Sequence, residues 1–159
     1  MVKISTATQK TALGALCAAL VTCATFLSLP VPGFRLYFNL GEGIIYSVAL
    51  MGGGVFGGLC GSVGAALADL LLGYPLWAPF TFVIKGAEGY VVGRLAPRSE
   101  KKALAAGALI MITGYTAMAA VLYGPAAAPV ELATDIIQTG IGAAFAFFIV
   151  PRLRKVVAL

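Results

Sequence analysis

The sequence contains no histidine among its 159 residues. It therefore lacks the side chain that most often binds metal ions or transfers protons near neutral pH. Charged residues are also scarce: they make up 11% of the chain, against about a quarter in soluble globular domains. Because 60% of the residues are hydrophobic and the mean hydropathy is +0.98, we predict an integral membrane protein.

Cysteine is rare as well, and its placement is uninformative. Cys17, Cys23 and Cys60 are odd in number, lie in apolar stretches and lack C-x-x-C spacing, so packing is favoured over a disulfide or metal site. The sequence also lacks a Walker motif and H-E-x-x-H, which argues against ATP hydrolysis and familiar membrane-enzyme chemistry. We expect no cofactor, no metal and no nucleic-acid partner.

The number of membrane crossings depends on residues 43–73, a long apolar stretch that contains a single charged residue, Asp69. As one helix it would be about 46 Å long, well beyond a hydrocarbon core of about 30 Å. Glycine disfavours a continuous helix, and Gly52-Gly53-Gly54 lies within this stretch. We therefore predict a break at the triple glycine.

The cationic residues support this division, because nine of the eleven form three clusters. If all three clusters are cytoplasmic, an even number of crossings must separate them. The same count argues against a cleaved signal peptide, since removing the first apolar stretch would make the number odd. The clusters are Lys3 with Lys10; Arg94, Arg98, Lys101 and Lys102; and Arg152, Arg154 and Lys155.

We predict an all-α integral membrane protein, with residues 1–159 forming a single transmembrane domain. Both termini are expected in the cytoplasm, and the proline-containing loops 29–41, 73–79 and 123–131 on the outer side. The six predicted helices span residues 10–29, 42–55, 57–73, 78–95, 103–124 and 131–151.

Three ionisable residues interrupt these apolar helices: Asp69, Lys85 and Glu88. Charges at the centre of a membrane helix cost about 2.5–3.5 kcal/mol each on insertion scales, and they usually mark a functional site. We expect the three side chains to form one hydrogen-bonded set. Alternatively, Lys85 forms a structural ion pair with Asp69 or Glu88, since Lys85 and Glu88 have a favourable i, i+3 spacing.

Small residues share faces with these polar side chains. Gly57, Gly61, Ala65 and Asp69 recur every four residues, so they lie on one face of a helix that can pack closely against a neighbour. The polar groups should therefore point into the bundle and converge on a cavity in its outer half. The candidate substrate-binding residues are Glu42, Asp69, Trp77, Lys85, Glu88, Glu131, Asp135 and Gln138.

Ordinary structural roles remain open for some of these residues. Glu131 and Asp135 would also suit the positive end of a helix dipole. Trp77 could anchor at the membrane interface or stack on a flat ring. Stacking is also open to Tyr37, Tyr74 and Phe80.

Three blocks of the sequence carry a family resemblance. They are "NLGEGIIYSVALMGGG" (39–54), the glycine-rich block 57–93 with "GAALADLLLGY" and "WAPFTFVIKG", and "ELATDIIQTGIG" (131–142). Together they resemble the S components of energy-coupling factor (ECF) vitamin transporters, nearest to the riboflavin and hydroxymethylpyrimidine branch. The resemblance implies a high-affinity vitamin-binding subunit of a prokaryotic cell membrane. It would dock on a transmembrane scaffold driven by two ATPases and topple in the membrane to release its cargo.

The resemblance also suggests a docking surface. S components carry an A-x-x-x-A arrangement on the first helix, and Ala15 and Ala19 match it, with Thr11 and Cys23 on the same stripe. Small side chains let a partner helix approach. The alternative is packing within the monomer.

The acidic residues limit the choice of substrate. Five carboxylates against Arg35 and Lys85 suit a ligand with hydrogen-bond donors or a protonatable ring nitrogen, such as hydroxymethylpyrimidine or pyridoxine. Riboflavin, which is larger and neutral, stays open. The alternative function is a small integral-membrane enzyme that acts on a lipid-linked substrate through its intramembrane carboxylates.

Overall fold

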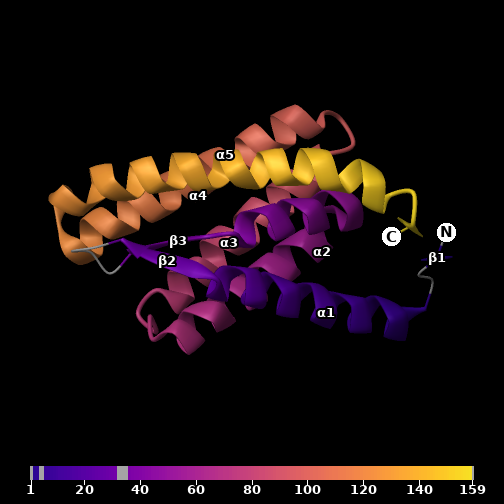
Figure 1. Cartoon of the computed structure of the whole chain (residues 1–159), viewed down its shortest axis with the longest axis horizontal. Coiled ribbons are helices and arrows are strands. Elements are labelled where there is room, and N and C mark those ends of the chain that lie inside the picture. The colour runs from indigo at the N-terminus through magenta and orange to yellow at the C-terminus, as the bar shows by residue number, and fades with distance from the viewer. Residues whose placement is uncertain (1, 4–5, 32–35, 159) are drawn as a thin grey trace.

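The computed structural model describes residues 2–3, 6–31 and 36–158, and most of them are helical. The helices are α1 (Ala7–Phe26), α2 (Gly41–Leu72), α3 (Ala78–Leu95), α4 (Glu100–Tyr123) and α5 (Ala128–Leu153), with the short 3₁₀ helix η1 (Pro125–Ala127). The strands are β1 (Val2–Lys3), β2 (Ser28–Val31), β3 (Leu36–Asn39) and β4 (Val157–Ala158). Figure 1 shows the helices packed as one elongated bundle.

The predicted break at the triple glycine is confirmed within α2. Gly53 has φ 80° and ψ −179°, a backbone conformation that only glycine adopts readily. It divides α2 into a first segment (41–52) and a second segment (54–72). A Cβ added at Gly57 would lie 2.5 Å from the Cβ of Ala49, and one added at Gly61 would lie 3.3 Å from Ile45. Since 57 faces 49 and 61 faces 45, the two segments run antiparallel.

Glycines also bring the second segment of α2 against α3. A Cβ added at Gly89 would lie 2.5 Å from the carbonyl oxygen of Gly57, and one added at Gly61 would lie 3.0 Å from that of Lys85. Any larger side chain at Gly89 would push the two backbones apart. The small-residue faces expected from the sequence are therefore close-packed interfaces, which turn the polar residues on the same helices inward.

The chain ends lie together at one end of the bundle, where Arg154 links the end of α5 to α2 and α4. β1 pairs in parallel with β4, with Val2 opposite Val157, and both termini lie at this end (Figure 1). Arg154 pairs with Glu100 at 2.5 Å and donates to the carbonyl of Leu50 at 2.9 Å. Because the break at Gly53 interrupts the helical hydrogen bonds there, Arg154 satisfies a carbonyl at the end of the first segment.

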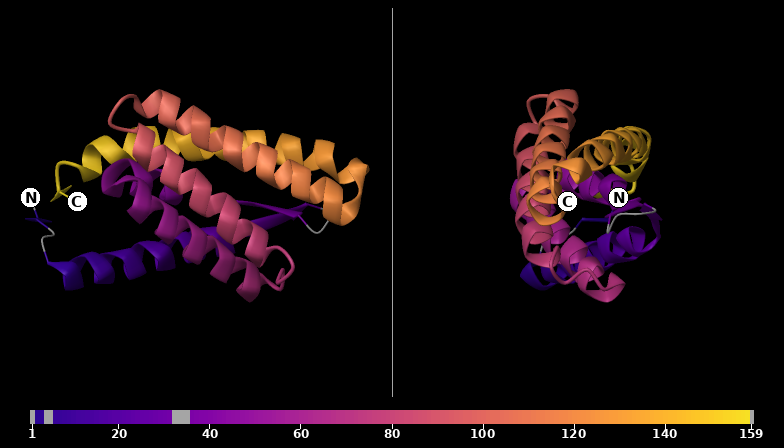
Figure 2. Two further views of the ribbon diagram at one scale, coloured as in Figure 1. Left: turned by 180° about the vertical axis from the view of Figure 1, so that it is seen from behind. Right: turned by 90° about the vertical axis from the view of Figure 1, so that its left-hand side faces the viewer.

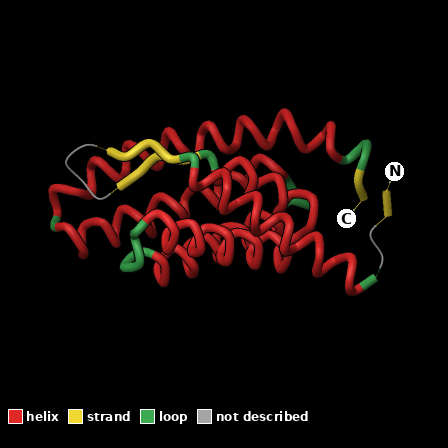
Figure 3. Tube along the Cα trace, turned by 60° about the horizontal axis from the view of Figure 1, so that its bottom comes forward, coloured by secondary structure: helices red, strands yellow, loops and turns green. Residues whose placement is uncertain are grey.

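A β-hairpin and the turns at 73–77 and 124–127 occupy the opposite end (Figures 2 and 3). β2 pairs antiparallel with β3, with Ser28 opposite Asn39. The sequence analysis expected only a loop at 29–41 and a first helix extending to residue 29, whereas α1 ends at Phe26. The other predicted helices agree to within about three residues. Arg35 lies outside the described residues, and the side chain of Tyr37 is not among those described.

Among the described residues, four helical stretches are long and apolar enough to cross a membrane: Ala7–Phe26, Gly41–Leu72, Glu100–Tyr123 and Pro125–Leu153. The fifth helix, α3, is 18 residues long and carries Lys85, Glu88 and Arg94. Exposed leucine, isoleucine, valine and phenylalanine side chains cover much of the bundle surface. This surface is typical of an integral membrane protein.

Candidate substrate-binding pocket

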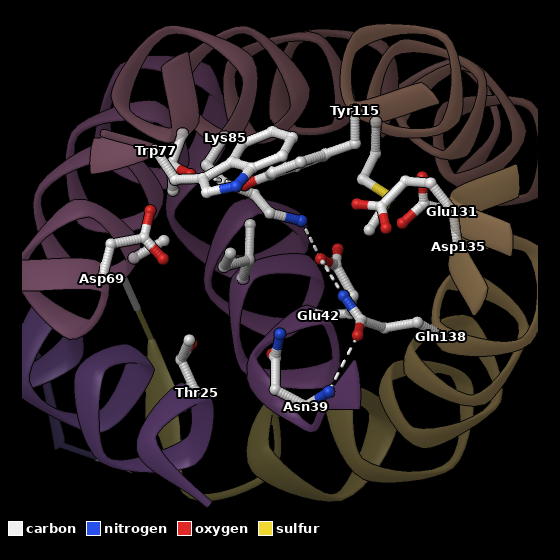
Figure 4. Close-up of a pocket in the computed structure, with 14 residues that line it drawn as sticks. Thr25, Asn39, Glu42, Asp69, Trp77, Lys85, Tyr115, Glu131, Asp135 and Gln138 are labelled. Carbon is white, nitrogen blue, oxygen red and sulfur yellow. Dashed lines mark hydrogen bonds and ion pairs between the residues drawn. The ribbon is translucent and has the colours of Figure 1, made fainter. Parts of the chain in front are cut away.

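A polar pocket opens among the helices near the hairpin end of the bundle (Figure 4). The side chains that line it leave a cavity of about 30 Å³ between them, enough for one or two water molecules. All five helices contribute to the wall. The lining residues are Thr25, Asn39, Glu42, Ile45, Ala65, Asp69, Trp77, Thr81, Lys85, Met111, Tyr115, Glu131, Asp135 and Gln138.

Lys85 forms the centre of the pocket's charge network. Its ammonium group is ion-paired with Glu42, from the start of α2, and lies 3.2 Å from Glu88 Oε2 on its own helix. All three side chains are almost completely buried. The pairing with Glu88 was one of the two expected from the sequence. The sequence analysis did not expect Glu42 as a partner of Lys85. Asp69 enters the pocket from the opposite wall (Figure 4).

A chain of hydrogen bonds continues from Glu42 to the hairpin. Gln138 Nε2 donates to Glu42 Oε1 at 3.3 Å, and Gln138 Oε1 accepts from the backbone N–H of Asn39 at 2.8 Å. Asn39 Oδ1 in turn accepts from the N–H of Gly41 at 2.8 Å. Gln138 therefore ties α5 both to the first segment of α2 and to the end of β3.

Carboxylates dominate the remaining polar wall. Glu131 and Asp135 project from successive turns of α5 and lie near each other, across the pocket from Asp69 (Figure 4). Among the described residues, Asp135 Oδ2 and Glu42 Oε2 are buried and have no hydrogen-bond partner. Leaving a buried acceptor unpaired is costly, so both oxygens are suited to accept hydrogen bonds from a bound donor.

Aromatic side chains cover one side of the charge network. Trp77 Nε1 donates to the hydroxyl of Tyr123 at 2.8 Å, and its ring lies 5.5 Å from that of Tyr115 at an interplanar angle of 30°. Lys85 Nζ is 5.1 Å from the centre of the Tyr115 ring, within cation–π range. The hydroxyl of Tyr115 donates to Thr81 at 3.0 Å.

Seven of the eight substrate-binding candidates line this one pocket, and the eighth, Glu88, is buried beside Lys85. Tyr74 and Phe80 instead pack around Trp77 outside the pocket lining. The sequence analysis missed seven lining residues as site candidates: Thr25, Asn39, Ile45, Ala65, Thr81, Met111 and Tyr115. Thr81 has a usable signal, because it lies one helical turn before Lys85. We find no comparable signal for Tyr115, an aromatic residue within a long apolar helix.

The two docking candidates lie on the outer surface of α1. Ala15 and Ala19 are both exposed, as are Thr11 and Cys23 of the same stripe. The opposite face of α1 packs on α2, where the hydroxyl of Thr22 donates to the carbonyl of Gly64 at 2.9 Å. Packing within the monomer therefore does not cover this stripe.

Two comparisons with known proteins bear on the pocket. A sequence model of the family "ECF-type riboflavin transporter, S component" matches residues 5–155. The chain is also 42% identical over 124 residues to a Pyrococcus woesei protein described as "Uncharacterized protein in gap 3'region", with 74% of this chain and 83% of the relative covered. The match to the family model covers all five helices and every residue of the pocket wall. The chain therefore belongs to the ECF-type riboflavin transporter S component family, whose members are membrane-embedded substrate-binding subunits of transporters and not enzymes.

Proposed function

We propose that this S component binds a small heteroaromatic vitamin or vitamin precursor carrying positive charge or N–H donors, of the hydroxymethylpyrimidine, pyridoxine or riboflavin class. Import would be driven by an ECF scaffold and two ATPases. The observation that carries the choice of substrate is the excess of carboxylates in the pocket. The alternative of a small integral-membrane enzyme that acts on a lipid-linked substrate is wrong, because members of this family are not enzymes.

The charge balance favours a cationic ligand. Glu42, Asp69, Glu131 and Asp135 line the pocket with Lys85 as the only cationic group in its described wall, and Lys85 already pairs with Glu42 and Glu88. An anionic vitamin would meet repulsion from several carboxylates at short range. A protonated ring or exocyclic amine would instead satisfy the buried oxygens of Asp135 and Glu42.

The aromatic side of the pocket favours a ring-shaped ligand. Trp77 and Tyr115 lie side by side on one side of the pocket, and offset stacking on such rings is worth about 0.5–1.5 kcal/mol beyond area burial. We expect the ligand ring to lie against this wall, with its donors directed toward α5.

Removing one carboxylate from α5 should weaken the binding of a cationic ligand more than that of a neutral or anionic one. We expect Asp135→Asn to lower affinity for a cationic aminopyrimidine about 10–100-fold, since a hydrogen bond to a charged group contributes about 1.5–3 kcal/mol. Isothermal titration of the purified protein with hydroxymethylpyrimidine, pyridoxine, riboflavin and the anionic vitamin pantothenate measures this effect.

Glu100→Gln is the matched control, because it removes an exposed carboxylate distant from the pocket. It should leave all affinities unchanged. Preferential binding of pantothenate, or equal affinities of Asp135→Asn and the wild type for every ligand, would contradict the proposed substrate class.

We further propose six crossings with both termini in the cytoplasm. The antiparallel segments of α2 would each cross once, which supports an even count between the cationic clusters. The start of α1, the turn between α3 and α4, and the end of α5 each carry one of the three clusters, and these segments lie at the end of the bundle where the termini meet (Figure 1). The excess of positive charge at this end favours a cytoplasmic location.

Cysteine labelling tests this topology. In a cysteine-free background, Glu100→Cys should react with an impermeant maleimide only when the cytoplasmic side is exposed, and Leu76→Cys should react from outside. Both positions are solvent-accessible on the isolated protein, since Leu76 and Glu100 are not buried. Labelling of position 100 from outside would overturn the six-crossing topology.

A further inference from the structure

A second cavity lies beside the polar pocket, between α1 and α5. Its cavity volume is about 180 Å³, larger than that of the polar pocket. The wall is largely apolar and comes from the end of α1, the start of α2 and the middle of α5. Its apolar side chains belong to Ala24, Leu27, Leu40, Ile44, Ile141 and Phe145.

The cavity opens on the membrane-facing surface. Leu27, Leu40 and Phe145 are 70%, 51% and 42% exposed, although they line its mouth. In a membrane-embedded chain, exposed apolar side chains at such a surface contact lipid acyl chains. A water molecule in this space would find few hydrogen-bond partners, whereas a hydrocarbon chain gains dispersion contacts with the whole wall.

Only a thin polar partition separates this cavity from the polar pocket. Asn39, Glu42 and Gln138 line both spaces. The hydrogen bonds from Gln138 to Glu42 and from Asn39 to Gln138 join the three residues. Whatever fills the apolar cavity therefore determines whether water reaches Glu42 and its ion pair with Lys85 from the membrane side.

We propose that an acyl chain of a membrane phospholipid occupies this cavity and completes the lateral wall of the polar pocket. The chain packs against Ile44, Ile141 and Phe145 and keeps water away from the Gln138 partition. This lipid site goes beyond the proposed function, because it does not depend on which vitamin the polar pocket binds.

Native mass spectrometry of the protein in a mild detergent tests the proposal. We expect the wild type to retain one phospholipid, and Ala24→Phe to lower the retained fraction about tenfold, since the new ring displaces about two methylene groups from the cavity. Leu20→Phe is the matched control. It places the same ring on the exposed surface of α1 outside the cavity wall and should retain lipid as the wild type does.

Ile141→Trp fills the cavity from α5 and replaces Ala24→Phe if the latter fails to fold. Vitamin affinity, measured by titration, should change less than about threefold in Ala24→Phe, because the apolar phenylalanine ring then keeps water away from the Gln138 partition in place of the acyl chain.

Equal lipid retention by the wild type, Ala24→Phe and Ile141→Trp, or no lipid retention in the wild type, would overturn the proposal. Loss of vitamin affinity with lipid retention unchanged would also overturn it, by assigning the cavity to the ligand. Lipid retention without any vitamin binding would contradict only the proposed function.

Discussion

Replacing Lys85 with methionine is expected to lower the free energy of unfolding by about 3–5 kcal/mol, the cost of breaking a buried ion pair from one side. The reason is geometric. Lys85 contacts Glu42 and Glu88 at once, and all three side chains are buried. Without the ammonium group, two carboxylates would face each other in a low-dielectric interior. Thermal unfolding in detergent, monitored for each variant, measures the loss.

A stepwise recovery should distinguish a three-residue unit from independent contacts. Combining Lys85→Met with either Glu42→Gln or Glu88→Gln should recover part of the lost stability. The triple variant, which carries all three substitutions, should recover most of it, because no buried charge is then left unpaired. Glu100→Gln, which is remote from Lys85, should be additive with Lys85→Met. If the stability changes of Glu42→Gln and Glu88→Gln were also additive with that of Lys85→Met, the three residues would not act as a unit.

The same variants separate a structural from a functional role. If Lys85, Glu42 and Glu88 have a purely structural role, those double and triple variants that fold well should bind vitamin with the affinity of the wild type. We expect instead that the triple variant loses affinity, since Glu42 and Lys85 both line the pocket.

Vitamin uptake should fail when the exposed stripe on α1 is made bulky. We expect Ala15→Leu and Ala19→Leu to reduce uptake in cells that co-express the ECF scaffold and ATPases to the level of cells lacking them. A larger side chain would prevent the close helix approach that small residues permit. Binding to the isolated protein should change less than about threefold, because neither residue lines the pocket. Uptake of labelled vitamin and titration of the purified variants measure the two effects.

Ala117→Leu provides the matched control for uptake. It makes the same change at an exposed alanine of α4 and should leave uptake intact. Normal uptake by both α1 variants, or a loss of binding equal to the loss of uptake, would contradict the docking role of this stripe.

The sequence predicted the inward-facing polar residues because local rules govern them. Gly57, Gly61 and Asp69 share a face through the helical repeat alone, so a close-packed glycine face also fixes the direction of the carboxylate. The break at Gly53 was predictable for a similar reason, since it follows from glycine content and the length limit of a membrane helix.

The partner of Lys85 was harder to predict because it depends on tertiary packing. Glu42 precedes Lys85 by 43 residues, and it reaches the ammonium group only because the first segment of α2 folds back along the second. The pairing of β2 with β3 was missed because the prolines of this stretch indicated a loop. Tyr115 and Met111 enter the pocket through the rotation of α4, which an almost uniformly apolar helix does not reveal.

Native mass spectrometry of the protein purified from a vitamin-replete host tests the central claim most directly. The predicted result is one bound heteroaromatic vitamin or precursor with a protonatable nitrogen or N–H donors, retained by the wild type and Glu100→Gln but depleted in Asp135→Asn. Retention of an anionic vitamin, or of no small molecule even after incubation with hydroxymethylpyrimidine, pyridoxine and riboflavin, would contradict an acidic vitamin-binding pocket in this chain.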